Sequence, residues 1–310
     1  QCIEAVSAGD GSAGWCLMTG ATAGAVAHWL APEVGQRVFG SPAAIAAGVF
    51  APRGEGRRAE GGIRLSGRWP WGSGAQHSSV LMVGVNARGA HHMAILPAAD
   101  VQILDTWRAA GLRGTGSHDL VVEDRFVPTA RLAPVLGPPV ATSPLARFPF
   151  FSLLSVGVAA VALGIARTAV EEFVELAMAK VPSSSSRPLA RRTSVQADVA
   201  RADALLQAGR ILVDASINDA WATITNRGQL SVEQRAQVRL AATMATRWAA
   251  EAVDLVHDAA GGTAVLEDAG SLPRCFRDIH VVTQHLLVSP PTLEGVGRVR
   301  LGIDPEGAGL

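Results

Sequence analysis

The sequence carries little charge, and what charge it has cancels. Only 17% of its 310 residues are Asp, Glu, Lys or Arg, and 27 basic residues balance 27 acidic ones. This balance excludes a broad basic face for nucleic acid. Hydrophobic residues make up 48% of the chain, which is enough for a large core and excludes a disordered protein.

Cysteine is also scarce. Cys2, Cys16 and Cys275 are odd in number and far apart, so the sequence offers neither a disulfide framework nor a zinc site. We expect all three to be small buried side chains in a reducing cytoplasm. We expect no bound metal.

Two stretches without formal charge, 11–32 and 148–166, approach the ~20 residues that cross a bilayer. Glycines and threonines dilute the first. The second runs directly into Arg167 and Glu171, which is typical of a central helix in a soluble bundle. No basic segment precedes either stretch, so we expect no signal peptide and no membrane partner. Because the chain begins with Gln1, we expect its natural start to be missing.

Three patterns follow one another along the chain. Residues 1–38 have apolar positions at helical spacing. Short β-type runs then occur between 44 and 133, separated by Gly, Asn, Pro and Asp, at 79–85, 92–96, 101–104 and 120–127. Such spacing predicts an antiparallel sandwich or barrel. A proline-rich stretch follows, which predicts a linker.

From residue 150 onward the pattern is helical. Long helices are predicted over 150–180, 194–226 and 231–260, and a fourth from 273 to about 289. Ser231 and Gln234 have the spacing of a capping box at the start of the third. This pattern predicts a four-helix bundle.

The sequence contains no P-loop, GxGxxG, HExxH or GxSxG motif. Three less specific segments could carry chemistry. Residues 67–77 contain Trp69, Trp71 and Ser73 among glycines. Such a loop can lay an indole against a planar cofactor while the serine bonds its edge. A tryptophan-rich hairpin packed on the core explains the same residues.

The second segment, 111–119, interleaves glycines with Arg113, Thr115 and Ser117. It suits an anionic or polar ligand group, or equally a tight turn with a surface arginine. The third segment, 277–285, places Asp278 and His285 on one stripe if it is helical. That imidazole can serve as an acid or base, or simply as a structural histidine.

Several motifs, taken together and in order, resemble the acyl-CoA dehydrogenase fold. They are GGIRLSGRWPWGSGAQH (61–77), TWRAAGLRGTGSHDLVVEDRFVP (106–128), GIARTAVEEFVELA (164–177), and the runs at 187–210 and 277–305. The sequence is most similar to the branch of monooxygenases that use reduced flavin from a separate reductase. The resemblance implies part of an N-terminal helical domain (1–40), a middle β domain (41–135), a linker (136–149) and a C-terminal four-helix bundle (150–310).

The resemblance also implies roles for single residues. Trp71, Gly72 and Ser73 match the loop beside the flavin, with the Ser73 hydroxyl near its N5 and O4 edge. The second loop, which borders the active site, is matched by Arg113, Gly116 and Ser117. Gln196 matches a position near the flavin tail, and His285 matches the imidazole held over the flavin.

One position separates two branches of the family. Many dehydrogenases carry a glutamate base eight residues after the Arg–Asp pair, where this chain has Leu286. A leucine cannot take a proton, and Glu294 is a weaker candidate. We therefore expect a monooxygenase rather than an acyl-CoA desaturase with tightly held FAD. The third alternative is a catalytically idle oligomeric scaffold.

The expected enzyme takes reduced FMN or FAD and O2, and hydroxylates an aromatic or polycyclic small molecule. The resemblance implies that His285 deprotonates or orients the substrate and that Ser73 stabilises the flavin adduct. A flavin reductase is the expected partner. The helix at 150–166 is too apolar to face water, and the resemblance implies that such helices are buried in a dimer of dimers. We therefore expect a homotetramer, with a homodimer as the alternative, in the cytoplasm.

Overall fold

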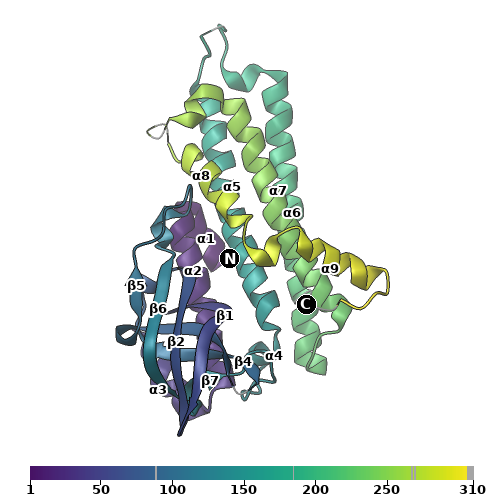
Figure 1. Ribbon diagram of the computed structural model, residues 1–310. Coiled ribbons are helices and arrows are strands. Elements are labelled where there is room, and N and C mark those ends of the chain that lie inside the picture. The colour runs from purple at the N-terminus through teal and green to yellow at the C-terminus, as the bar shows by residue number, and fades with distance from the viewer. Residues whose placement is uncertain (88, 184, 267, 269, 306–310) are drawn as a thin grey trace. The chain divides into compact units, whose positions relative to one another are not determined.

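The chain divides between a helical unit and a sheet unit (Figure 1). The computed structural model describes residues 1–87, 89–183, 185–266, 268 and 270–305. The helical unit takes residues 1–15, 109–112 and 151 onward, and the sheet unit takes 16–108 and 113–150. The two units interleave along the chain. The four contiguous domains expected from the sequence stay a prediction.

Seven strands form one sheet with the order β5-β6-β2-β1-β3-β4-β7. The strands are β1 (Ala46–Ala59), β2 (Gly62–Gly72), β3 (Val80–Ala87), β4 (Ala90–Pro97), β5 (Gln102–Leu104), β6 (His118–Pro128) and β7 (Leu132–Ala133). All neighbours are antiparallel except β1 and β3, which run parallel. The expectation of a wholly antiparallel sheet is therefore wrong, because the connection after β2 returns the chain to the far edge of β1.

Two apolar clusters among the described residues stabilise the sheet unit. Trp69 is fully buried among Leu65, Leu81 and Leu120, and its indole Nε1 donates to the Gly84 carbonyl. The second cluster packs strand residues against the part of α2 (Gly11–Gly24) that follows residue 15 and against α3 (Pro32–Phe39). Burial in the first cluster fixes β2 as an interior strand between β6 and β1, and the end of β2 carries the first candidate loop.

The helical unit begins with α1 (Cys2–Gly9) and contains three long helices. These are α5 (Phe150–Ala179), α6 (Thr193–Arg227) and α7 (Val232–Ala260). Helices α6 and α7 pack along each other, and both α8 (Leu272–Val282) and α9 (Pro291–Arg300) contact α7. The capping box predicted at Ser231 and Gln234 is confirmed. A short helix, α4 (Pro144–Arg147), lies in the sheet unit.

The predicted fourth helix is too long. Helix α8 ends at Val282, a 3₁₀ turn follows over Leu286–Val288, and α9 begins at Pro291. Proline at two successive positions cannot donate to a preceding turn, so the chain restarts there. His285 therefore lies in a turn rather than on a helix.

Two further expectations concern burial. Helix α5 is long and apolar enough to cross a membrane, but 67% of its most apolar window is buried inside the structure, as in the core helix of a soluble protein. Cys275 is buried and Cys16 partly buried, whereas Cys2 is exposed. The expectation of three buried cysteines is thus wrong for Cys2, which is exposed to solvent in the first turn of α1.

Candidate active site

The end of strand β2 is irregular, and this irregularity exposes one tryptophan. The pairing of β2 with β6 shifts register between Trp69 and Gly72. At Trp71 the backbone adopts a positive φ of 71°, and the side chain is 66% exposed. Bulges of this kind re-aim a side chain. Of the two tryptophans in this segment, Trp69 is part of the core and Trp71 has a largely exposed indole.

Two loops meet beside Trp71 in the sheet unit. The Gly74 N–H donates to the Thr115 carbonyl at 2.9 Å. The hydroxyls of Ser73 and Ser117 lie 2.7 Å apart, and those of Ser117 and Thr115 lie 2.6 Å apart. All three side chains are buried. The structure thus brings together two predicted residues, Ser73 and Ser117, and adds Thr115, which stands in the same sequence motif and for which the resemblance implies no role.

Glycines let these loops approach closely. A Cβ at Gly72 would lie 2.7 Å from the Leu120 side chain, and one at Gly116 would lie 2.7 Å from the Gln76 side chain. Gly116 also has a φ of 51°, which favours glycine. Arg113 is exposed at the start of the 3₁₀ turn Arg113–Thr115. The predicted positions Gly72, Gly116 and Arg113 therefore lie around the hydroxyl cluster of Ser73, Ser117 and Thr115.

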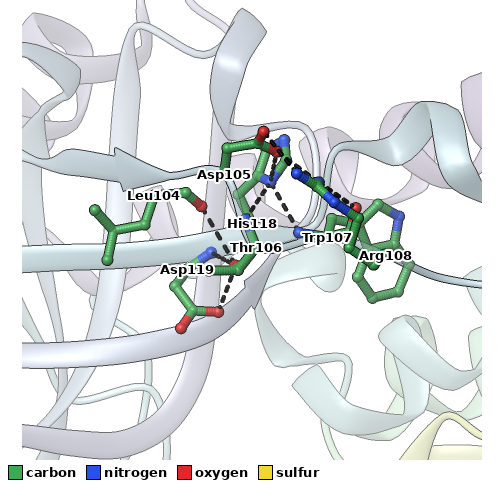
Figure 2. A network of polar contacts seen from close by, with 7 residues as sticks. All are labelled: Leu104, Asp105, Thr106, Trp107, Arg108, His118 and Asp119. Carbon is green, nitrogen blue, oxygen red and sulfur yellow. Dashed lines mark hydrogen bonds and ion pairs between the residues drawn. The ribbon is translucent and has the colours of Figure 1, made fainter.

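The residue after Ser117 anchors a neighbouring segment (Figure 2). His118 is buried, and its Nδ1 accepts hydrogen bonds from the backbone N–H groups of Thr106 and Trp107, each at 3.1 Å. The Thr106 hydroxyl bonds Asp119 at 2.9 Å, while Arg108 pairs with Asp105 and its hydrogen bonds lower the pKa of that carboxyl. This network ties residues 105–108 to the start of β6.

His285 is the predicted catalytic residue of the helical unit. It is half-buried at the N-cap of the 3₁₀ turn, and its Nδ1 accepts a 3.3 Å hydrogen bond from the Leu287 N–H. The Trp15 indole lies edge-on at 5.4 Å between ring centroids. Burial lowers the pKa of His285 to about 4, and the charge of Arg239 acts in the same direction. The imidazole is therefore neutral at pH 7.

Asp278 does not share a helical stripe with His285, because α8 ends between them. Its buried carboxylate accepts a 2.6 Å hydrogen bond from the Leu112 N–H, and burial raises the pKa of this carboxyl. The backbone of Gly111 passes so close to Arg277 that a Cβ there would lie 2.2 Å from its carbonyl oxygen. Asp278 thus holds the segment 109–112.

The remaining predicted positions lie on the surface of the helical unit. Gln196 is exposed in the first turn of α6, and its side-chain amide donates to the Ala190 carbonyl at 2.9 Å. Leu286 is 75% exposed, and Glu294 is exposed in the first turn of α9. Gln196 therefore caps the turn before its helix.

Comparisons with known proteins place this architecture. The family described as acyl-CoA dehydrogenase, C-terminal domain, matches residues 156–290. Indole-3-acetate monooxygenase of Pseudomonas putida is 32% identical over 310 residues, which cover 98% of this chain and 79% of the relative. The FADH2-dependent resorcinol hydroxylase, oxygenase component, of a Rhizobium species is 28% identical over 94% of this chain and 79% of its own.

A solved structure agrees on the fold. XiaF from a Streptomyces species, in complex with FADH2 and glycerol, has a TM-score of 0.91 at 24% identity and covers 98% of this chain and 81% of its own. The chain therefore belongs to the flavin-dependent monooxygenases of the acyl-CoA dehydrogenase superfamily. Both the fold and the oxidoreductase class expected from the motifs are confirmed.

The sheet-unit residues fit a flavin. An isoalloxazine is a flat aromatic ring with hydrogen-bonding groups along one edge. An exposed indole offers a plane for it, and the neighbouring Ser73 hydroxyl, held by Ser117, offers a fixed bonding group. Gly72 and Gly116 allow the close packing against Leu120 and Gln76 that keeps these loops in place.

Proposed function

We propose that this chain is the oxygenase component of a two-component monooxygenase that hydroxylates an aromatic or polycyclic small molecule. A separate cytoplasmic reductase would supply reduced FMN or FAD. The observation that carries the proposal is the exposed Trp71 plane beside the buried hydroxyls of Ser73, Ser117 and Thr115. The relatives named for indole-3-acetate and resorcinol support an aromatic substrate.

When bound, the reduced flavin supplies electrons that activate O2 for transfer to the substrate. In the sheet unit Trp71 would hold the flavin ring, and Ser73 would bond its polar edge. Ser117 restrains Ser73, because the two hydroxyls are 2.7 Å apart. In the helical unit His285 would bind the substrate through Nε2, since its Nδ1 accepts a hydrogen bond from the Leu287 N–H. Apolar neighbours such as Trp15 limit access of water.

The decisive experiment adds reduced flavin to the purified protein. We expect the purified protein to be nearly colourless and to oxidise no NADH until a flavin reductase is added. With the reductase, or with photoreduced flavin, it should consume O2 and hydroxylate a member of a panel that begins with indole-3-acetate. Trp71→Ala should weaken reduced-flavin binding, while Trp71→Phe should keep most of it.

Two outcomes would contradict the proposal. Stoichiometric FAD that survives gel filtration and is reduced by an acyl thioester would indicate a desaturase. Absence of any interaction with reduced flavin, in protein of normal helix content, would indicate a scaffold.

A further inference from the structure

Helix α7 contains a buried cation. Arg239 is 2% exposed and stands on the helix face that also carries the buried Ala236 and Ala242. Burial lowers the pKa of Arg239 to about 10, so the guanidinium is still charged at neutral pH. Burying a charge is costly unless polar groups meet it, which indicates a specific role for this side chain.

The guanidinium is directed at the turn that carries His285. Its Nη2 donates to the Leu287 carbonyl at 3.2 Å and lies 3.5 Å from the Thr292 hydroxyl. The same Leu287 donates its backbone N–H to Nδ1 of His285 at 3.3 Å. Arg239 therefore holds the residue that in turn holds the imidazole.

This arrangement fixes where the imidazole proton lies. A ring nitrogen that accepts a hydrogen bond carries no proton, so the neutral ring has its proton on Nε2. Protonation of Nδ1 would set its N–H against the Leu287 N–H and would add a second cation near Arg239. Helix α2 contributes Trp15, whose ring centroid lies 5.4 Å from that of His285 and whose indole does not titrate.

We infer that Arg239 is a positioning residue that keeps His285 neutral as the Nε2–H tautomer. His285 then acts on the substrate as a hydrogen-bond donor rather than as a general base. The matching substrate group is an oxygen acceptor, such as a phenolate or carboxylate. The action on substrate rests on the proposed function, but the tautomer and the protonation state do not.

The test is ¹⁵N NMR of histidine-labelled protein without flavin or substrate. His285→Gln assigns one of the eight imidazoles. We expect that ring to show a bare Nδ1 and a protonated Nε2 from pH 8 to pH 5, with a titration midpoint well below that of an ordinary histidine. In Arg239→Gln the midpoint should rise and the second tautomer should appear, and Arg239→Lys should restore part of the wild-type midpoint.

A matched control lies on the same helix. Arg247 is exposed on α7, and Arg247→Gln should leave the His285 spectrum unchanged. If Arg239→Gln fails to fold by circular dichroism, Arg239→Lys carries the test, and a His285 midpoint identical to that of the wild type in the folded variant overturns the role of Arg239. A proton on Nδ1, or a midpoint near that of free imidazole in the wild-type protein, overturns the inference.

Hydroxylation rates of His285 variants distinguish a hydrogen-bond donor from a general base at this position. With reduced flavin supplied, His285→Gln keeps a donor, and His285→Glu keeps a base. We expect the Gln variant to hydroxylate faster, while a lost general base would cost the Gln variant roughly 10²–10⁴-fold. A faster Glu variant overturns the donor role. Failure of the wild-type protein to hydroxylate anything, with the expected NMR spectrum, would count against the proposed function alone.

Discussion

Ser117 lies between two other buried hydroxyls, and each hydroxyl has one hydrogen to donate. Its oxygen is within hydrogen-bond distance of both Ser73 and Thr115. Ser117→Ala should therefore release Ser73 at a cost of about 0.5–1.5 kcal/mol, and product formed per O2 consumed should fall about 2- to 10-fold.

Single-turnover product yield and released H2O2 measure this effect. Thr115→Val, which is one hydroxyl further from Ser73, should have a smaller effect. Ser41→Ala is the control, because Ser41 is an exposed serine of the same unit. Unchanged coupling in Ser117→Ala would remove Ser117 from the proposed site.

The lowered pKa of His285 has a consequence for stability. The folded value of about 4 lies below the ordinary 6.5, so the unfolded chain binds this proton more readily. The contribution of His285 is present above pH 6.5 and is lost as the pH falls toward 4. Urea unfolding at several pH values should show a shallower acid decline for His285→Gln than for wild type. His77→Gln, at an exposed histidine, should follow the wild-type curve.

Residues within motifs were easier to predict than residues that act across the fold. Ser73 and Ser117 stand in glycine-rich segments and were predicted from sequence. Arg239 was missed, although a cation at the helical spacing of buried alanines is a signal. Its partner Leu287 lies 48 residues away, and only folding brings the two together.

At the scale of elements, the long helices were predictable because their apolar periodicity is local. The end of α8 was not, since apolar residues continue past it at Leu286 and Leu287 while the helix stops at Val282. Strand β1 was not predicted, because its C-terminal half is charged and largely exposed. Its parallel partner β3 is set by a pairing that no local pattern encodes.

The His118 ring accepts two backbone hydrogen bonds from the segment between β5 and β6. His118→Ala would remove the acceptor shared by the Thr106 and Trp107 amides. Because this segment is partly exposed, water can replace the ring, and we expect a loss of about 1 kcal/mol. Hydrogen exchange at these two amides should become roughly 5- to 10-fold faster. His118→Asn, which keeps an acceptor, should restore part of the protection, and His77→Ala should change nothing.

At the scale of the whole molecule, helix α6 rather than α5 offers a surface for assembly. The apolar helix α5 is covered mostly within its own chain, so its composition does not demand an oligomer. Helix α6 instead exposes Ile211 at 67% and Trp221 at 43%. Large exposed apolar side chains are typical of interfaces, so the homotetramer stays our prediction, with α6 as part of its contact surface.

Sedimentation at micromolar concentration tests this assembly. Ile211→Glu and Trp221→Glu should each weaken it, since a buried apolar side chain contributes about 1.5–3 kcal/mol. Gln102→Glu, at an exposed position on strand β5 of the sheet unit, should leave it intact. A wild-type protein that sediments as a monomer would contradict the prediction.

Residues 109–112 belong to the helical unit, so their final contacts can form only late in synthesis. The backbone N–H of Leu112 finds its carboxylate on Asp278, 166 residues later in the chain. At ~5–20 residues per second, the ribosome needs roughly 8 to 33 seconds to deliver that partner. Throughout this time a nascent chain that has already formed its strands holds those four residues without their final contacts, open to chaperones and proteases.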